Sequence, residues 1–243
     1  MRLCAQDAAA YGVENGRNIC ELVSKLASLD GKFMIRIGMM NPGNVLPKLD
    51  CILDLYENDK VFKFLHLPVQ SGSDDVLSRM KRNYSVKDFK AIIGGFKERC
   101  PDGTVSTDII TGFPGETDEE FHMSFSLIEN IKPDIVNITR FSARPRTPAA
   151  TINDQVPSRI AKDRSRLLTD LRFEISKYTY GSRVGMCVNA LATEYRKAGT
   201  TFLRTKDYWP VVINEVVALG KWYKLELIDS GKTHLIGKIH TKP

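Results

Sequence analysis

The chain has 243 residues, of which 42% are hydrophobic and 26% are charged, as is normal for a globular protein with a sizeable core. No apolar run approaches the roughly 18 residues of a membrane-spanning helix, and the N-terminus lacks the basic-then-apolar pattern of a signal peptide. These features exclude a helical membrane protein, and we expect a cytosolic one. The net charge of +6 is uneven: residues 1–150 hold 19 Lys/Arg and 20 Asp/Glu, whereas residues 151–243 hold 16 and 9.

Residues 17–143 alternate between two hydrophobic periods. Apolar, β-branched runs typical of buried parallel strands occupy 33–40, 63–69, 104–112 and 134–142. Helical patterns lie between them at 18–29, 45–58, 73–82, 85–100 and 117–131, with Ser73 and Thr117 as predicted N-caps. This alternation predicts βα units on a parallel sheet or barrel. The run at 104–112 has the apolar and β-branched character of a buried strand, so we expect it between the strands at 63–69 and 134–142.

The pattern changes after residue 150. Residues 157–180 predict one long basic helix that begins at Pro157. From Gly181 onward, short β-runs separated by turns predict a small all-β barrel. The net charge of +7 over residues 151–243 favours contact with a nucleic acid, and a solvated basic face is the alternative.

Polar and glycine residues follow each predicted strand. Ligands of parallel βα folds bind at the carboxyl ends of strands, so this convergence predicts one shared small-molecule site. Arg140 and Arg144 at the last strand end call for an anionic partner. Asp108 is consistent either with a site role or with a hydrogen bond to a helix cap, and His66 with a satisfied core histidine.

The cysteines lie at least 16 positions apart, which excludes the close spacing of a metal or cluster motif. An odd count in a chain without a signal peptide favours reduced and mostly buried thiols. We therefore expect no metal site formed by this chain alone. The cysteines are Cys4, Cys20, Cys51, Cys100 and Cys187.

Several motifs jointly resemble one family. The stretches "HLPVQSGSDDVLSRMKRNY", "STDIITGFPGET" and "ARPRTPAA" resemble successive strand-end motifs of the radical S-adenosylmethionine methylthiotransferases. The upstream "QDAAAYG" and "RIGMMNP" fit in the same order. The pairing of "RIGMMNP" with the "HLPVQSGSDDVLSRMKRNY" motif resembles the archaeal and eukaryotic branch. That branch transfers a methylthio group to N6-threonylcarbamoyladenosine at position 37 of tRNA, beside the anticodon.

The resemblance implies an α/β fold: a partial (βα)6 radical SAM barrel that lacks its first βα unit, followed by a small all-β TRAM barrel. The implied divisions are a truncated barrel at 1–156, a linking basic helix at 157–180 and an RNA-binding TRAM-like domain at 181–243. The implied S-adenosylmethionine contacts are Gln70 and Ser71 at its methionine or ribose end, Asp108 at a hydroxyl, Gly112 and Phe113 along the adenine and methionine, and Arg144 toward the cluster or substrate.

The chain departs from the family in two places. It has no CxxxCxxC loop, through which the family binds its radical-generating [4Fe–4S] cluster, and it has Arg146 where the family usually has glycine. We therefore expect a C-terminal fragment or a late start, inactive alone, with no stable cluster. We also expect weak S-adenosylmethionine binding, in a pocket lined by Gln70, Ser71, Phe113 and Arg144.

The stretch "EYRKAGTTFLRTKDYWPVVI" interleaves basic and aromatic residues, which favours phosphate contacts and stacking on unpaired bases. We expect it to bind a tRNA anticodon loop, and the alternative is that its aromatics fill the barrel core. Two other functions remain open, namely a non-catalytic RNA-binding protein that keeps the barrel as a scaffold and a barrel enzyme acting on a phosphorylated metabolite. The predicted RNA contacts are Arg196, Lys197, Arg204, Lys206 and Tyr208.

Overall fold

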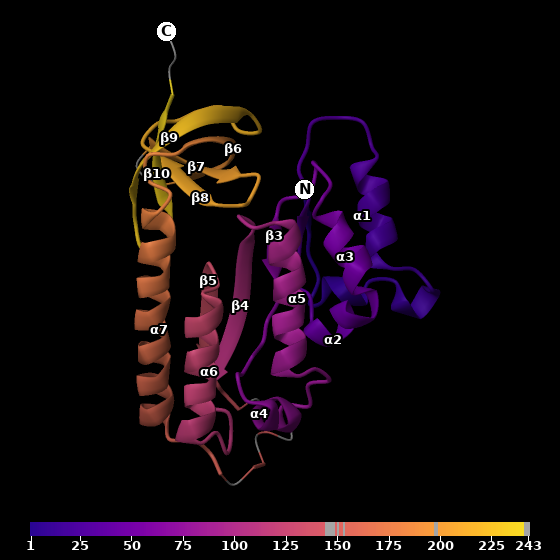
Figure 1. Cartoon of the computed structure of the whole chain (residues 1–243), viewed down its shortest axis with the longest axis vertical. Helices are drawn as coiled ribbons and strands as arrows, with labels where there is room; N and C mark the ends of the chain where they lie inside the picture. The colour runs from indigo at the N-terminus through magenta and orange to yellow at the C-terminus, as the bar shows by residue number, and fades with distance from the viewer. Residues whose placement is uncertain (144–148, 150, 153, 197–198, 241–243) are drawn as a thin grey trace.

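The computed structural model describes residues 1–143, 149, 151–152, 154–196 and 199–240, which form an α/β unit and a C-terminal β-barrel (Figure 1). Arg144 and Lys197 lie outside the described residues. The α-helices of the described part are α1 (Ile19–Ala27), α2 (Pro42–Val45), α3 (Leu49–Leu55), α4 (Asp74–Arg79), α5 (Val86–Arg99), α6 (Asp118–Ile131) and α7 (Ser158–Gly181), with 3-10 turns at Ala8–Ala10, Val13–Asn15 and Leu46–Lys48.

The central sheet is parallel and three-stranded, in the order β3 (Phe64–His66), β4 (Thr104–Thr111) and β5 (Ile135–Arg140). The prediction that the 104–112 strand lies between its two neighbours is confirmed. A second parallel pair, β1 (Arg2–Leu3) with β2 (Arg36–Ile37), continues beside it through a bridge from Ile35 to Val61.

Helices cover one face of the sheet, with α5 and α6 in front of the strands in Figure 1 and α7 running alongside β5 back to the barrel. Strand side chains alternate between the two faces. Those that face the helices, such as Leu65, Val105 and Val136, join the large core with Phe89 and Phe121 of α5 and α6. We call the opposite face of β2–β5, which carries the polar residues, the inner face.

Local signals place the helix starts. The Ser73 hydroxyl accepts from the Val76 N–H, and Thr117 forms a reciprocal capping box with Glu120, so both predicted N-caps are confirmed. The prediction of one helix over 45–58 is wrong, because the chain there forms α2, a 3-10 turn and α3. Pro47 lies in that turn and has no N–H to continue an α-helix.

The C-terminal barrel is closed, in the strand order β10-β8-β7-β6-β9, which confirms the predicted small all-β module. Its own core of fully buried aliphatic side chains includes Leu203, Val211 and Leu225. The strands are β6 (Cys187–Arg196), β7 (Thr200–Thr205), β8 (Pro210–Ile213), β9 (Trp222–Ser230) and β10 (Leu235–Ile239).

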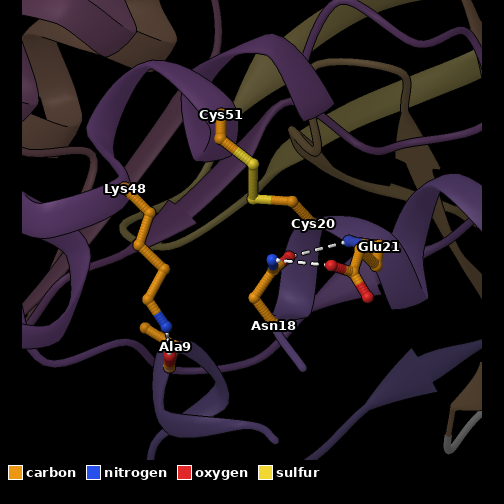
Figure 2. The surroundings of a disulfide bond; sticks show 6 residues. All are labelled: Ala9, Asn18, Cys20, Glu21, Lys48 and Cys51. Atoms are coloured by element: carbon orange, nitrogen blue, oxygen red, sulfur yellow. Dashed lines mark hydrogen bonds between the residues drawn. A yellow bond between two sulfur atoms is a disulfide. The ribbon is translucent and has the colours of Figure 1, made fainter. Parts of the chain in front are cut away.

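The expectation of reduced and mostly buried cysteines is wrong in two respects. Cys20 of α1 and Cys51 of α3 form a disulfide, since these packed helices bring their Cα atoms to 6.2 Å, within the range that a disulfide spans (Figure 2). Cys4 and Cys187 are exposed thiols, and only Cys100 is a buried one. Sequence spacing carried no information about the α1–α3 contact.

None of the helices in the described residues has the length and hydropathy that a membrane crossing requires.

Candidate functional site

Three polar side chains meet at the middle of the inner face. Asp108 of β4 accepts hydrogen bonds at Oδ1 from His66 Nε2, at 3.0 Å, and from Asn137 Nδ2, at 2.7 Å. The register places Asp108 directly opposite Asn137 of β5, and His66 ends β3 on the other side. We call these three residues the inner-face triad. Within the described residues, Asp108 Oδ2 has no hydrogen-bond partner, which leaves it available to a ligand hydroxyl.

The environment keeps Asp108 ionised. Burial raises the pKa of Asp108. The hydrogen bonds from His66 and Asn137 and the charge of His66 lower the pKa by a larger amount, so that the net pKa is below the ordinary value. The side chain is 23% exposed and is therefore accessible from the inner face. An accessible carboxylate with a free oxygen is suited to orient a hydroxyl or an amino group.

Gln70, four residues after β3, has a left-handed backbone conformation, with φ at 72°. Two backbone hydrogen bonds hold it there, from Gln70 N–H to Asp108 O and from Ile110 N–H to Gln70 O. A non-glycine residue held in this region is uncommon and concentrates at functional sites. Ser71 is fully buried, and its hydroxyl lies 3.3 Å from Ser124 Oγ of α6.

The Gly-Phe-Pro-Gly turn after β4 is fixed by contacts to α7. Gly112 has φ at 75°, and a Cβ atom there would lie 2.6 Å from Ala161 Cβ, so both conformation and space require glycine. Its N–H donates to Glu116 Oε2 at 2.8 Å, and Arg164 Nη1 donates to the same oxygen at 2.6 Å. Burial raises the pKa of Glu116, against the opposing influence of Arg164. These contacts therefore fix the backbone conformation of the turn.

A cavity of about 700 Å³ opens where β4 and β5 end, lined by Gly112, Arg140, Phe141, Ser142 and Gln155 among others. Phe113 is 6% exposed and packs edge-on against Phe141, with ring centroids 5.2 Å apart. A cavity at the strand ends was predicted. Of the four residues expected to line it, Gln70, Ser71 and Phe113 are not among the lining residues, and Arg144 lies outside the described part of the chain. The Ser71 hydroxyl instead pairs with Ser124, and the Phe113 ring packs against Phe141.

The residues predicted to contact RNA lie in two environments: some face solvent, and others pack against the α/β unit. Tyr208 is 5% exposed and packs against Phe62 and Phe64, so protein side chains hold its ring. Lys206 pairs with Asp59, before β3. Arg204 stacks on Tyr208, its guanidinium carbon 4.2 Å from the ring centroid.

Among the members of the predicted set that the structure describes, Arg196 is the exposed one. It pairs with Glu194 at 2.8 Å and lies over Phe202 at 4.7 Å from the ring centroid. Exposed pairs of this kind contribute little to stability and exchange readily for a phosphate.

Sequence reasoning missed two functional candidates, Asn137 and Arg164, and placed Arg36 on its strand without a role. Asn137 was not recognised because its inner-face neighbour depends on strand register. Arg164 was read as one charge of a basic helix, whereas it is 6% exposed and holds the strand-end turn. The sequence signal for Asn137 is a polar side chain inside an apolar run. No group of three or more His, Cys, Asp or Glu side chains in the described residues could hold a metal ion.

Residues 13–128 match the family model of the Radical SAM superfamily. The solved structure of coproporphyrinogen III oxidase (HemN) from Escherichia coli, a radical SAM enzyme, is similar with a TM-score of 0.51 and 18% identity. That similarity covers 64% of this chain and 37% of the enzyme, and it concerns the fold alone.

Curated proteins are similar over nearly the whole chain. A probable threonylcarbamoyladenosine tRNA methylthiotransferase of Archaeoglobus fulgidus is 41% identical over 240 residues, which cover 98% of this chain and 56% of that protein. The human threonylcarbamoyladenosine tRNA methylthiotransferase is 35% identical over 240 residues, 97% of this chain and 41% of that protein. The chain spans about half the length of the archaeal relatives it matches. Part of the chain therefore matches the Radical SAM superfamily, and nearly all of it is similar to the threonylcarbamoyladenosine tRNA methylthiotransferases, the family that its strand-end motifs predicted.

Proposed function

We propose that this chain is the S-adenosylmethionine- and tRNA-binding part of a methylthiotransferase that modifies N6-threonylcarbamoyladenosine at position 37 of tRNA. The observation that carries the proposal is the 41% identity over 98% of the chain to a protein of that name. An identity of this size over both the α/β unit and the barrel supports a shared arrangement of the two.

In this proposal the strands β1–β5 are five of the six strands of a (βα)6 barrel whose first βα unit is absent from the chain. The parallel pairing of β1 with β2 and the bridge from Ile35 to Val61 support that order. The proposed divisions are residues 1–156 for the barrel, 157–180 for a linking helix and 181–243 for a TRAM-like domain.

The inner face offers groups that fit S-adenosylmethionine. Asp108 Oδ2 has no partner among the described residues and can accept from a ribose hydroxyl, and Gln70 and the Gly112 turn lie at the neighbouring strand ends. Bound there, the cofactor would supply the 5′-deoxyadenosyl radical on which methylthio transfer depends. The role of this chain's residues is to orient the cofactor, and His66 and Asn137 fix the carboxylate that does so.

The donor set of this chain does not fit a [4Fe–4S] cluster. Such clusters are held by convergent cysteine thiolates. Here two of the five cysteines are joined to each other, and no three lie together. We derive no step through a cluster for this chain, and cluster ligands must come from elsewhere if the chain is to take part in radical chemistry.

The cytoplasm, where tRNA is modified, is the proposed location. The anticodon loop is the proposed RNA partner, through the barrel and the basic helix α7. The net charge of +7 over residues 151–243 supports RNA as the partner. RNA binding should weaken steeply with rising salt concentration because it releases counterions.

A non-catalytic RNA-binding role is the second candidate, favoured by the cysteine arrangement described above. The two candidates differ in their need for S-adenosylmethionine. In the enzyme reading the inner-face triad binds cofactor, whereas in the scaffold reading it only ties strands together.

Calorimetry of the whole chain with S-adenosylmethionine tests the cofactor site. We expect weak but measurable binding that Asp108→Asn lowers about tenfold to a hundredfold, since a hydrogen bond to a charged group contributes about 1.5–3 kcal/mol. Glu98→Gln, an exposed carboxylate on α5, is the matched control. Equal affinity in the parent and Asp108→Asn would remove the triad from the cofactor site.

A chimera tests the activity. The N-terminal half of the Archaeoglobus fulgidus relative, joined upstream of Met1, should convert N6-threonylcarbamoyladenosine in tRNA to its methylthio derivative, detected by mass spectrometry of the nucleosides. No product from the chimera, with product from the intact relative, would contradict the enzyme reading and favour the scaffold.

A further inference from the structure

A second cavity, of about 730 Å³, lies between the β1–β2 edge and the barrel, at the opposite end of the sheet from the strand-end turns. It takes residues from both units and from three strands of the barrel. We call it the interdomain cleft. The described residues that line it include no Asp or Glu. Its charged and exposed aromatic side chains are Arg2, Lys32, Arg36, Arg204, Lys221 and Trp222.

Two arginines form the inner wall of the cleft. Arg36 of β2 and Arg204 of β7 both lie over Tyr208, with guanidinium carbons 5.6 Å and 4.2 Å from the ring centroid. Arg36 Nε is buried and has no hydrogen-bond partner in the described residues. Burial lowers the pKa of Arg204, as expected for a cation taken out of water.

These arginines differ from the other cations at the contact between the two units. Arg183 pairs with Asp134 at 3.3 Å, and Lys206 pairs with Asp59. Neither Arg36 nor Arg204 takes part in any ion pair of the described residues. Two partly desolvated like charges in one cleft are unfavourable until an anion lies between them.

The rim of the cleft adds a flat aromatic surface. Trp222 at the start of β9 is 44% exposed, and the exposed side chains of Lys221 and Lys32 flank the opening. Cations that surround an exposed aromatic ring are the usual elements of single-stranded nucleic-acid sites, where the cations bind phosphates and the ring stacks on a base.

We infer that the interdomain cleft binds a single-stranded ribose-phosphate segment, with a phosphodiester between Arg36 and Arg204 and an unpaired base on Trp222. This inference rests on the proposed function in one respect, that RNA is the partner. It assigns the RNA contact to a cleft shared by both units, whereas the sequence placed that contact on the barrel and the basic helix before it.

Fluorescence anisotropy with a labelled tRNA anticodon stem–loop tests the cleft residues. The double variant Lys32→Ala/Lys221→Ala should lower the slope of log K against log salt by about 1.4, at about 0.7 for each single-strand phosphate contact. The double variant Lys87→Ala/Lys90→Ala removes two exposed lysines of α5 and should leave the slope unchanged.

Trp222→Ala should weaken binding about tenfold, within the range measured for loss of one stacked base. Tyr11→Ala, which removes an aromatic ring that is 40% exposed and lies outside the barrel and α7, is the matched control. Intrinsic fluorescence gives a second readout, because the chain has two tryptophans and Trp209 is only 4% exposed. RNA should quench the Trp222 emission.

The outcomes separate this inference from the proposed function. If the parent binds the stem–loop and the cleft variants bind as the controls do, the cleft is not the site and the proposed function stands. If the parent binds S-adenosylmethionine but no RNA, both the cleft inference and the tRNA part of the proposed function are overturned. Loss confined to the cleft variants supports both.

Discussion

The α/β unit and the C-terminal barrel differ in how they bury the apolar face of a β-sheet. The barrel closes on itself, so its inward side chains, such as Leu203 and Leu225, form an apolar core without a partner. The α/β sheet covers one face with helices and keeps the inner-face triad accessible on the other. Chemistry is therefore available inside the open unit, whereas the barrel can offer only its outer surface.

The open unit depends on ionic contacts to hold its shape, and the largest effect should come from breaking one. Arg164→Ala leaves Glu116, with a side chain only 1% exposed, without its cation. We expect a loss of about 3–5 kcal/mol in the free energy of unfolding, measured by guanidinium denaturation.

Arg159→Ala on the same helix is the control for Arg164→Ala. Its side chain is 93% exposed and pairs with Asp163 only at 4.0 Å, so the change should cost less than about 1 kcal/mol. Equal losses from the two variants would show that the strand-end turn does not depend on its buried ion pair.

The closed barrel should instead be sensitive to volume. A Cβ atom at Gly237 would lie 2.9 Å from Val211 Cγ1 and 3.4 Å from Leu225 Cδ1. Gly237→Ala should therefore cost about 1–3 kcal/mol by overpacking, measured by denaturant unfolding. At Gly181, just before the barrel, nothing lies within 4 Å of such an atom, and Gly181→Ala should be neutral or stabilising. A neutral Gly237→Ala would mean that the barrel core has room to relax.

The triad should make the stability of the open unit depend on pH. The pKa of Asp108 is lowered in the folded protein, so its carboxylate contributes stability above its ordinary value of 3.8 and loses that contribution as pH falls through the folded value. In urea unfolding at several pH values, the difference between the parent and Asp108→Asn should shrink from about pH 4 downward. A difference that stays constant down to pH 3 would contradict the hydrogen-bonded carboxylate.

The smallest effect concerns two adjacent glycines of α5. Nothing lies within 4 Å of a Cβ atom at Gly94, so Gly94→Ala should stabilise the protein by about 1 kcal/mol through helix propensity. A Cβ atom at Gly95 would lie 2.8 Å from Leu53 Cδ1, and Gly95→Ala should gain less. Thermal unfolding of both variants checks that Gly94→Ala stabilises more than Gly95→Ala. An equal or larger gain from Gly95→Ala would show that Leu53 moves aside freely.

The sequence was informative where one stretch decides the structure. The apolar run at 104–112 predicted a central strand, and Ser73 and Thr117 predicted helix starts, because these features depend on neighbours a few residues away. The same holds for the closed barrel, whose short strands and turns follow one another along the chain.

Features that join distant segments were not predictable. Asp108 meets Asn137 through strand register, and Glu116 meets Arg164 across 48 positions. The basic and aromatic composition around Tyr208 was equally compatible with an RNA surface and with a contact between units. The structure places Tyr208 in the contact between the two units. Composition alone does not indicate whether an aromatic ring packs against protein or stays exposed to bind RNA.

The contact between the two units is made in part by backbone. Lys63 N–H donates to Lys206 O at 2.9 Å, and Thr104 donates to Asp207 O through its N–H at 3.2 Å and its hydroxyl at 2.7 Å. Carbonyl oxygens are the same in every residue, so substitutions at 206 and 207 leave these acceptors in place. The amino-terminal ends of β3 and β4 can thus keep their hydrogen bonds to the barrel while the side chains around the interdomain cleft change. Ligand preference at the cleft can therefore evolve while the backbone contact between the two units is preserved.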